Sequence, residues 1–433
     1  MSVRRTRSWP SSPPGERAPR RMIQAPKGTF DVLPEASARR EGLELQARRI
    51  LGGAGYRRIE TPTFESTELF ARGVGEATDI VQKEMYSFDD GGGRSLTLRP
   101  EGTAPVCRAY MEHGMHKLPQ PVKLWYLSSF FRAEAPQRGR YRQFWQVGAE
   151  AIGAAGPEVD AELIVLLAEL LEAMGVRELS LRLASLGSPE TRSEYRAELS
   201  AYLRAREEQL SPEVRGRIER NPMRAFDASD PGTREVMRGA PTLLERLDTD
   251  DAEHFAAVRA LLEDAGLRFE LDPTLVRGLD YYTRTLFEFS SDALGAQSGV
   301  AGGGRYDRLI EQLDGPRIPA CGWAAGVERI LLAGTEQPIA PPLVDVFVAR
   351  AGDAGGLAFR LAREARAAGL AAQLELAGRS LKGQLKHADR LGVRYVAIVG
   401  GEDAVSLKEM ESGEQRELSP DEVIPSILRG VRL

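Results

Sequence analysis

Two pairs of strand-like segments, each joined by a short turn, constrain the fold of this 433-residue chain most strongly. KEMYSF and RSLTLRP carry partly alternating apolar residues and flank the turn at residues 89–93, where glycines tolerate positive φ angles. KLWYLSSFFRAE and YRQFWQVGAEAIG flank the polar loop at residues 135–140 in the same way. We therefore expect two hairpins in the first part of the chain, and a further strand at LFEFSS.

Helical patterns surround these strands. Apolar residues recur at helical spacing over residues 36–51, and glycines follow, as expected past a helix C-terminus. A second helix is predicted from about Pro157 to Met174, with Gly175 after its end. Residues 188–268 are more polar, helical in pattern and interrupted by NPMRAFD and PGTRE. We interpret them as a helical insertion between two halves of a sheet domain.

A separate domain is predicted after the proline-containing linker at residues 334–343. Beyond it, VDVFVAR, AAQLEL and RYVAIVG alternate with the helical patterns of GLAFRLAREARAAG and SLKGQLKHADRLG, which indicates a small α/β domain at residues 344–433. At the other end, residues 1–21 are rich in Arg, Pro and Ser and have little apolar content. We expect a disordered tail there and a fold that begins near Met22.

Composition and charge exclude several classes of protein. With 42% hydrophobic and 28% charged residues, the chain fits two or three domains that each bury a core. The net charge of −5 excludes a protein held to nucleic acid by overall charge, although it is compatible with a local basic surface. The two cysteines and four scattered histidines have no metal-ligand spacing, so we expect no protein-held metal and no disulfide framework. Since neither a bilayer-spanning apolar run nor a secretory signal is visible, we expect a cytoplasmic protein without a membrane partner.

LRPEGT, at residues 98–103, places Glu101 and Thr103 on either side of a glycine at the expected end of a strand. A carboxylate and a hydroxyl group in that position can bind an amino group. Pro-Glu-Gly is also an ordinary turn sequence, so a purely structural role is the alternative.

Arginines surround the polar loop at residues 135–140. Their forked guanidinium groups match phosphate oxygens, so this density suits a nucleotide triphosphate or an RNA end. Gln146 and Glu150 lie an even number of residues apart, hence on one face of the following strand. Phe144 and Val147 indicate a partly buried strand, and buried polar side chains need partners, which favours a binding site over a solvated hairpin. The arginines are Arg132, Arg138, Arg140 and Arg142.

LVRGLDYYTRTLFEF sets Arg277 before a glycine turn and two adjacent tyrosines, Tyr281 and Tyr282. Adjacent residues of a strand face opposite sides, so we expect one tyrosine to pack while the other offers its hydroxyl group to a ligand. The alternative is that both belong to the core.

AGGGRYDRLI and CGWAAGVERILL are the last candidate segments. The glycines at residues 302–304 would let the backbone approach a ligand closely, and Gly326 leads into a helix whose first turns carry Glu328 and Arg329. Neither GxGxxG nor GxxxxGK(S/T) occurs, so the Rossmann and P-loop modes of nucleotide binding are not supported.

Taken together and in this order, the segments resemble the histidyl-tRNA synthetase family, which belongs to the class II aminoacyl-tRNA synthetases. The resemblance runs from about Met22 to the C-terminus. Class II motif 1 would lie around Pro62, motif 2 at residues 130–150 and motif 3 at residues 326–332, while LVRGLDYY and GGGRYD resemble the two histidine-specific motifs. The segments that carry the resemblance are KGTFDVLP, TPTFESTELF, LRPEGT, FRAEAPQRGRYRQF, LVRGLDYYTRTLFEF, GGGRYD and GVERIL.

The resemblance implies an α+β fold with an antiparallel-sheet catalytic domain of the class II type. This domain would occupy residues 22–187 and 269–333, with the helical insertion at 188–268 and an α/β anticodon-binding domain at 344–433. It also implies a homodimer built partly through motif 1.

The implied activity is ATP-dependent activation of L-histidine to histidyl-adenylate, followed by transfer to the 3′ end of tRNA(His). Mg²⁺ would be bound mainly by ATP rather than by the protein. The resemblance assigns histidine binding to Glu101, Thr103, Gln146, Glu150, Tyr281, Tyr282 and Tyr306. It assigns ATP binding to Arg132, Arg140, Arg277 and Arg329, and catalysis to Arg277 and Arg132.

Two positions depart from the family pattern. Ala135 stands where an arginine is usual and Trp145 where a histidine is common, which affects the expected recognition of the tRNA acceptor end. The main alternative function is that of a non-enzymatic, synthetase-like regulatory subunit of ATP phosphoribosyltransferase. That alternative predicts loss of the C-terminal domain and of the arginines, and this chain retains both. A class II synthetase for another amino acid is the second alternative, against which LVRGLDYY argues.

Overall fold

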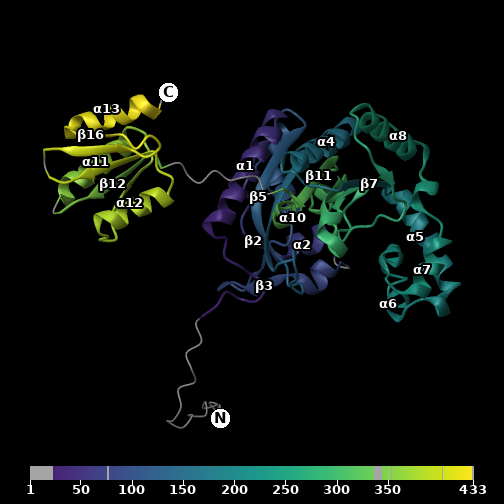
Figure 1. Ribbon diagram of the computed structural model, residues 1–433. Coiled ribbons are helices and arrows are strands. Elements are labelled where there is room, and N and C mark those ends of the chain that lie inside the picture. Colours follow the sequence, from purple (N-terminus) through teal and green to yellow (C-terminus); the bar gives the residue numbers. More distant parts are fainter. Residues whose placement is uncertain (1–22, 76–77, 336–343, 353, 402, 432–433) are drawn as a thin grey trace, which may run out of the picture. The chain divides into compact units, whose positions relative to one another are not determined.

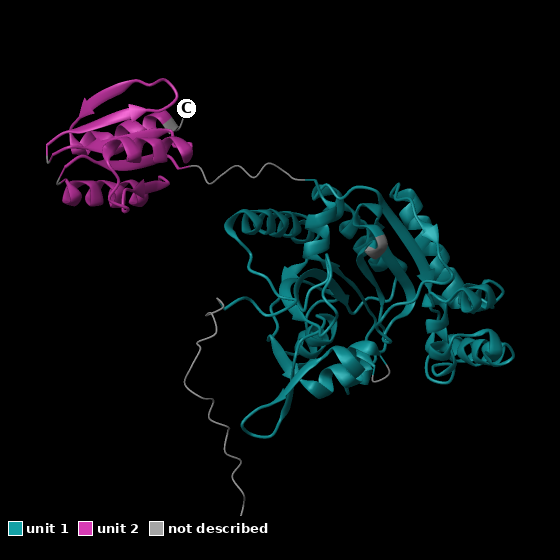
Figure 2. Ribbon diagram, turned by 60° about the horizontal axis from the view of Figure 1, so that its bottom comes forward, with its two compact units in different colours: residues 1–337 teal, residues 338–433 magenta. Residues whose placement is uncertain are grey.

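The structure is a computed structural model that describes residues 23–75, 78–335, 344–352, 354–401 and 403–431. The chain divides into two compact units, Met1–Gln337 and Pro338–Leu433, which Figure 2 shows in different colours. The expected tail at residues 1–21 and residues 336–343 of the expected linker lie outside the described residues.

The first unit is built on an eight-stranded sheet with the strand order β1-β5-β6-β11-β10-β9-β7-β8 (Figure 1). All pairs between β5 and β7 in this order are antiparallel. At the two edges, β1 pairs with β5 and β8 pairs with β7 in parallel. The predicted hairpin is present as β5 and β6, and this sheet with its helices confirms the expected α+β fold. The strands are β1 (Arg57–Arg58), β5 (Val122–Phe131), β6 (Gln143–Ile152), β7 (Leu179–Ser185), β8 (Glu270–Leu271), β9 (Thr283–Ser291), β10 (Gly299–Arg305) and β11 (Ala320–Gly326).

Helices on one face of the sheet bury its largest hydrophobic core. On β6, Val147, Ala149 and Ala151 point into this core, so the even-numbered residues of the strand face the other way. Gln146 and Glu150 therefore share the opposite face, as predicted. The helices of the core are α1 (Pro34–Gly53), α4 (Pro157–Ala173), α8 (Thr249–Asp264) and α10 (Val327–Ala333).

A smaller, three-stranded sheet contains the other predicted hairpin, in the order β2-β4-β3. Its turn is closed by Asp90, whose carboxylate accepts the backbone N–H groups of Gly92 and Arg94. LRPEGT leaves β4 at Leu98 and enters α3 at Thr103, so the expectation that Glu101 and Thr103 lie at a strand end is wrong. The chain turns into a helix there because the carboxylate of Glu101 accepts the first backbone N–H groups of α3. The elements are β2 (Phe64–Ser66), β3 (Tyr86–Asp89), β4 (Ser95–Leu98) and α3 (Thr103–Glu112).

The stretch between β7 and β8 is helical. Three of its helices begin with proline after Ser188, Ser211 or Asp230, whose side chains accept a backbone N–H of the first turn. NPMRAFD forms the short helix η4, and PGTRE begins α7. The two segments therefore do not interrupt the helical region as the sequence suggested. The helices before α8 are α5 (Pro189–Arg204), η3 (Glu207–Gln209), α6 (Pro212–Arg215), η4 (Pro222–Asp227), α7 (Pro231–Arg238) and η5 (Leu243–Arg246). The other helices of the first unit are α2 (Thr67–Val74), η1 (Ile80–Glu84), η2 (Met115–Lys117), η6 (Asp292–Gln297) and α9 (Leu309–Gln312).

The second unit is an α/β domain around a five-stranded sheet, in the order β13-β12-β14-β15-β16. The first three strands in this order are parallel, and β15 and β16 continue the sheet in antiparallel fashion. Among the described residues of the chain, no helix has the length and apolar content that crossing a bilayer requires. The elements are β12 (Val346–Arg350), α11 (Gly355–Ala367), β13 (Ala372–Leu374), α12 (Leu381–Arg390), β14 (Tyr395–Val399), β15 (Val405–Glu409), β16 (Gln415–Leu418) and α13 (Pro420–Val431).

Candidate functional site

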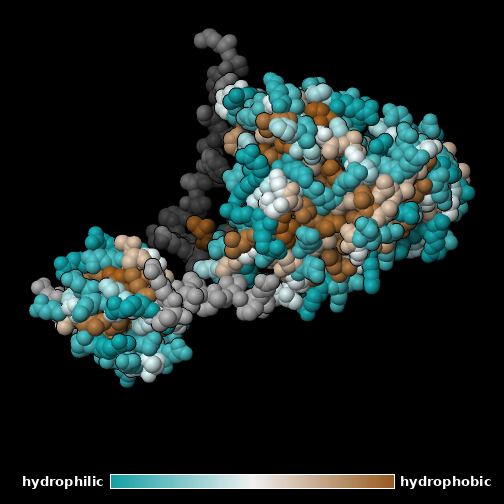
Figure 3. All heavy atoms as spheres, turned by 90° about the horizontal axis from the view of Figure 1, so that it is seen from above, coloured by the Kyte–Doolittle hydropathy of each residue, from teal (hydrophilic) through white to brown (hydrophobic). Residues whose placement is uncertain are grey.

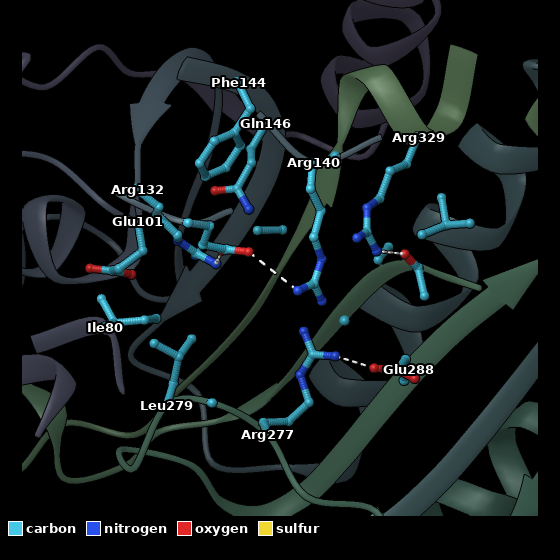
Figure 4. A pocket seen from close by; sticks show the side chains of 18 of the residues that line it. Ile80, Glu101, Arg132, Arg140, Phe144, Gln146, Arg277, Leu279, Glu288 and Arg329 are labelled. Atoms are coloured by element: carbon cyan, nitrogen blue, oxygen red, sulfur yellow. Dashed lines mark hydrogen bonds and ion pairs between the residues drawn. The ribbon is translucent and has the colours of Figure 1, made fainter. Parts of the chain in front are cut away.

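A pocket of about 580 Å³ lies on the face of the large sheet opposite α1 and α4 (Figure 4). Its walls come from the LRPEGT connection, the β5–β6 hairpin, the segment before β9 and the start of α10. On its floor, Gly302 of β10 pairs with Ala324 of β11, so the centre of the sheet carries only small side chains there. Gly302 also pairs with Glu288 of β9, whose carboxylate forms part of the wall.

Most of the residues predicted from the motifs line this pocket, although they are far apart in the sequence. Antiparallel pairing of β6, β11, β10 and β9 brings their segments together. Glu150 and Tyr306 do not line the pocket, and lie in the buried layer beneath it. The predicted residues on the wall are Glu101, Thr103, Arg132, Arg140, Gln146, Arg277, Tyr281, Tyr282 and Arg329.

One end of the pocket is acidic and buried. Glu101 is 3% exposed, and its carboxylate oxygens accept the backbone N–H groups of Thr103 at 2.8 Å and Ala104 at 3.0 Å. Burial raises the pKa of Glu101, while these hydrogen bonds favour its ionised form. Nearby, Oε1 of Gln146 is buried without a hydrogen-bond partner, which leaves an acceptor available to a bound donor.

Glu150 is completely buried under this acidic end. Its Oε1 accepts the hydroxyl group of Thr103 at 2.8 Å, and its Oε2 accepts that of Tyr306 at 2.5 Å. Glycine is required opposite it on β11, because a Cβ atom at Gly322 would lie 1.7 Å from Oε2 of Glu150. The hydroxyl group of Tyr126 also donates to Oε1 at 3.4 Å, so Thr103 connects the pocket wall to a buried carboxyl group that is held by three hydroxyl groups.

The other end of the pocket gathers arginines, two of which pair with carboxylates of the wall: Arg140 with Glu134 and Arg277 with Glu288. Figure 4 shows Arg140, Arg277 and Arg329 pointing toward one another across the pocket, with Arg132 nearer to Glu101. Arg329 donates from Nε to the carbonyl oxygen of Gly139 at 3.1 Å and also donates to that of Gly299. Burial lowers the pKa of Arg329, and repulsion by Arg140 and Arg277 acts in the same direction. Like charges held this close together suit an anionic ligand with several oxygens.

The arginines around residues 135–140 do not all belong to this group. Arg132 donates from Nε to the carbonyl oxygen of Pro100 at 2.9 Å and stacks on Phe144, which fixes it on the wall. Arg138 and Arg142 do not line the pocket, and Arg142 instead donates to the carbonyl oxygen of Glu134 at 3.2 Å. The interpretation of this hairpin as purely solvated is therefore wrong for Arg132, which is partly buried.

The expectation that Tyr281 and Tyr282 face opposite sides is wrong. Both rings are buried in the same hydrophobic cluster, with centroids 4.7 Å apart, and both line the pocket. The pair precedes β9 and lies outside any strand, so strand alternation does not apply to it.

Of the glycines at residues 302–304, only the first lies where a bound ligand could approach its backbone. Gly302 lines the pocket, and a Cβ atom there would lie 2.6 Å from Cζ of Arg277. At Gly303 and Gly304 a Cβ atom would instead meet backbone oxygens of β11 and β9 at 2.2 and 2.4 Å. These two glycines are required by the packing of neighbouring strands.

Sequence reasoning missed five charged residues of the wall, which are Asp79, Glu84, Glu134, Arg224 and Glu288. Arg224 comes from η4 of the helical insertion and pairs with Asp227 at 2.7 Å. Arg224 and Glu288 stand in NPMRAFD and LFEFSS, but these segments carry no signal for a pocket residue, because tertiary contacts alone bring the two side chains to the wall. Within the described ranges, no group of three or more His, Cys, Asp or Glu residues could hold a metal ion.

Comparison with known proteins finds a matching family model for each of the two units. Residues 28–330 match a family model described as histidyl-tRNA synthetase, and residues 344–429 match one described as an anticodon binding domain. The chain is 46% identical over 411 residues to the histidine–tRNA ligase of Acetivibrio thermocellus, which covers 93% of this chain and 99% of that protein. It is 49% identical over 405 residues to the histidine–tRNA ligase of Moorella thermoacetica, with 92% and 96% covered.

Solved structures have the same fold. The apo histidyl-tRNA synthetase of S. aureus aligns with a TM-score of 0.78 at 36% identity, over 94% of this chain and 100% of that one. A Bacillus halodurans protein described as an ATP phosphoribosyltransferase regulatory subunit/histidyl-tRNA synthetase aligns with a TM-score of 0.64 at 25% identity, over 88% and 99% of the two chains. Because the family model spans most of the chain and these relatives match it along nearly their whole length, the chain belongs to the histidyl-tRNA synthetase family.

Proposed function

We propose that this chain is an aminoacyl-tRNA ligase that joins L-histidine to the 3′ end of tRNA(His) in two steps and consumes ATP. The observation that carries the proposal is the polarity of the pocket: a buried acidic end beside a group of converging arginines. An amino acid has a cationic amino group and an anionic carboxylate, and ATP has a polyanionic tail. The pocket offers a complementary charge to each of these parts.

Histidine would bind at the acidic end. Glu101 and Thr103 are suited to its amino group, and the unpartnered oxygen of Gln146 can accept a further hydrogen bond. The imidazole ring would be recognised by Tyr281 and Tyr282 on the wall, with Tyr306 and Glu150 supporting them from the buried layer beneath. A site whose buried polar groups require such partners rejects apolar analogues, because an apolar analogue leaves these groups unpaired.

ATP would bind at the arginine-rich end, with Arg132, Arg140, Arg277 and Arg329 around its phosphates. In the first step, a carboxylate oxygen of histidine attacks the α-phosphorus, the bond to the pyrophosphate oxygen breaks, and histidyl-adenylate and pyrophosphate form. Negative charge develops on the phosphoryl oxygens during this step. A fixed cation such as Arg277 stabilises that charge more in the transition state than in the ground state.

Mg²⁺ would enter together with ATP. It would be held mainly by the phosphate oxygens of ATP rather than by a dedicated set of protein ligands. Its contribution would be to screen the charge of the departing pyrophosphate.

In the second step, the terminal ribose of tRNA(His) would accept the histidyl group from the adenylate and release AMP. The match of residues 344–429 to an anticodon binding domain supports a role for the second unit in reading the anticodon. We place this reaction in the cytoplasm, where tRNA is used in translation.

A homodimer is also part of the proposal. Figure 3 shows patches of apolar side chains between hydrophilic ones on one face of the first unit, and exposed apolar patches are a feature of protein interfaces. On α1, Leu45 is 65% exposed. Sedimentation of the purified protein at micromolar concentration tests the dimer directly.

The alternative function as a regulatory subunit of ATP phosphoribosyltransferase is supported less well. The Bacillus halodurans structure shows that this fold occurs under both descriptions. The retained arginines of the pocket and the matched anticodon domain favour the ligase.

Histidine-dependent ATP–pyrophosphate exchange tests the proposal, with the other amino acids as controls. Exchange should occur with histidine alone, and Arg277→Ala should reduce its rate by about 100- to 1,000-fold. Arg246→Ala is a matched control, because it removes an exposed arginine that pairs with Glu198 outside the pocket. Absence of exchange with every amino acid, from folded protein, would overturn the ligase and lead to a test of binding to ATP phosphoribosyltransferase.

A further inference from the structure

We propose that Glu288 is a positioning residue that aims Arg277 at the reacting phosphate, and that Arg182 and Asp272 hold Glu288 from the far side. This inference rests on the proposed function, since it concerns the arginine to which we assign the transition-state contact. It adds to the site a chain of charged residues on β7, on β9 and just after β8.

Glu288 stands between two arginines and uses one carboxylate oxygen for each. Oε2 accepts a hydrogen bond from Arg277, and Oε1 accepts one from Arg182. Glu288 lies in the middle of β9, directly opposite Arg182 on β7. With a side-chain exposure of 15%, it is the most buried member of the three, so its position is set by the sheet.

Arg182, on the side of Glu288 away from the pocket, is itself held in place. Arg182 donates from Nη1 to Oδ2 of Asp272 at 3.0 Å, just beyond the end of β8. Arg182 does not line the pocket, and neither does Asp272. Arg182 therefore contacts Glu288 from outside the pocket lining, while Asp272 holds Arg182 through one carboxylate oxygen and accepts Thr274 at the other.

Arg277 needs such a support because of where it is attached. It belongs to the irregular segment between β8 and β9, and an arginine side chain that is not held samples many rotamers. The space over Gly302 admits its guanidinium group, since a Cβ atom there would lie 2.6 Å from Cζ of Arg277. Gly302 thus provides the room, and Glu288 determines which way the guanidinium group faces.

Two other roles for Glu288 can be distinguished from positioning. A simple counterion would only lower the positive charge of the pocket, so any carboxylate nearby would replace it. A ligand for the cation that accompanies ATP would act on the metal requirement and independently of Arg277. A positioning residue acts through Arg277 alone, which a double-mutant cycle detects.

The experiment measures kcat and KM for ATP in pyrophosphate exchange for wild type, Arg277→Ala, Glu288→Gln and the double variant. The glutamine of Glu288→Gln matches the size of glutamate but not its hydrogen bonding, because it has one acceptor oxygen where two arginines must be served. Glu288→Gln should lower kcat about 10- to 100-fold without raising KM for ATP, because removing an anion does not weaken ATP binding. In the Arg277→Ala background the same substitution should change the rate by less than about 2-fold.

Further variants separate position from charge and from folding. Glu288→Asp keeps the charge but withdraws the carboxylate, so it should remain impaired, whereas a counterion would be restored. Arg182→Met, outside the pocket, should also lower kcat, again only when Arg277 is present. Glu198→Gln removes a carboxylate from an exposed ion pair with Arg246 and is the matched control. Thermal unfolding of each variant checks that the fold is intact.

The outcomes are distinct. Losses that multiply in the double variant would overturn the positioning role, and so would a rise in the Mg²⁺ concentration needed by Glu288→Gln that is equal with and without Arg277. Full activity of Glu288→Asp would overturn it in favour of a counterion. Wild-type protein without any exchange would overturn the proposed function and this inference together, which separates that failure from a failure of the inference alone.

Discussion

Tyr306 donates a hydrogen bond from its hydroxyl group to Oε2 of Glu150, at 2.5 Å, in the buried layer beneath the pocket. Thr103 donates to the other carboxylate oxygen at 2.8 Å. Burial raises the pKa of Glu150 to about 8, although both hydrogen bonds favour the ionised form. Glu150 is therefore a buried carboxyl group that keeps its proton to a higher pH than an exposed carboxyl group does.

We predict that Glu150 makes the folded protein less stable as the pH rises. Between the usual carboxyl pKa of 4.5 and about 8, the unfolded chain loses this proton while the folded protein keeps it. The free energy of unfolding should then fall by up to about 1.4 kcal/mol per pH unit for this one group. Burial also raises the pKa of Glu101, which adds to the fall in the same direction.

Urea unfolding at a series of pH values measures this dependence. Glu150→Gln cannot ionise and should reduce the slope, whereas Glu198→Gln, on the exposed side of α5, should leave it unchanged in this pH range. Equal slopes in wild type and Glu150→Gln would contradict the prediction.

Gly302 and Gly303 should respond differently to alanine. In Gly302→Ala the new methyl group meets the end of the flexible Arg277 side chain, which can move. The fold should survive while exchange falls by about 10- to 100-fold, because Arg277 is displaced. In Gly303→Ala the methyl group meets the carbonyl oxygen of Gly322 at 2.2 Å, so the sheet itself must shift.

Thermal unfolding and exchange, measured on both variants, check this contrast. Gly303→Ala should have the lower melting temperature, and Gly302→Ala should keep the wild-type value. A strongly destabilised Gly302→Ala with normal specific activity in its folded fraction would refute the idea that Gly302 leaves space for the Arg277 side chain.

Removal of Asp160 should destabilise the first unit severely. Asp160 and Arg305 are completely buried and paired at 2.8 Å, and they connect α4 to β10. Asp160→Ala leaves the Arg305 cation in the interior without its main counterion, which costs about 3 to 5 kcal/mol. Urea unfolding measures the loss, and Arg305→Met in the same background should recover part of it because the unpaired charge is then absent. A double variant no more stable than Asp160→Ala would argue against this account.

Arg192 should couple the helical insertion to the tyrosine pair. From α5 it donates to the carbonyl oxygen of Tyr282 at 2.7 Å and to that of Asp280 at 3.2 Å. Arg192→Ala removes this hold, so we expect KM for histidine to rise about 10-fold while KM for ATP changes little. Arg196→Ala is the matched control one turn along α5, because its side chain donates to the carbonyl oxygen of Arg220 within the insertion. Equal effects of the two substitutions on KM for histidine would exclude this coupling.

The secondary structure could be predicted where its signals are local. The turn at Asp90 and the proline after Ser188 act on their own neighbours, so the hairpin of β3 and β4 and the start of α5 follow from short stretches of sequence. Strand alternation placed Gln146 and Glu150 on one face for the same reason. The prediction failed for Tyr281 and Tyr282, because it assumed a strand where the chain is irregular.

The candidate site was predicted only in part. Motifs identified Arg277, Glu101 and Arg329 one by one, since each stands in a recognisable segment. Glu288 and Arg224 were missed, because nothing in LFEFSS or NPMRAFD says which side chain will face the pocket. Their place depends on strand register and on the position of η4 against the segment before β9.

The sequence by itself determined the hairpins, the helical insertion, the α/β character of the second unit and the family to which the chain belongs. These properties depend on periodicity, turn residues and motif order, which are read along the chain. Only the tertiary structure decided that Glu288 lies between Arg277 and Arg182, and that Glu150 lies under Thr103 and beside Tyr306. The reason is physical: charge pairing, burial and hydrogen bonding act between neighbours in space, and the pairing of β6, β11, β10 and β9 chooses those neighbours.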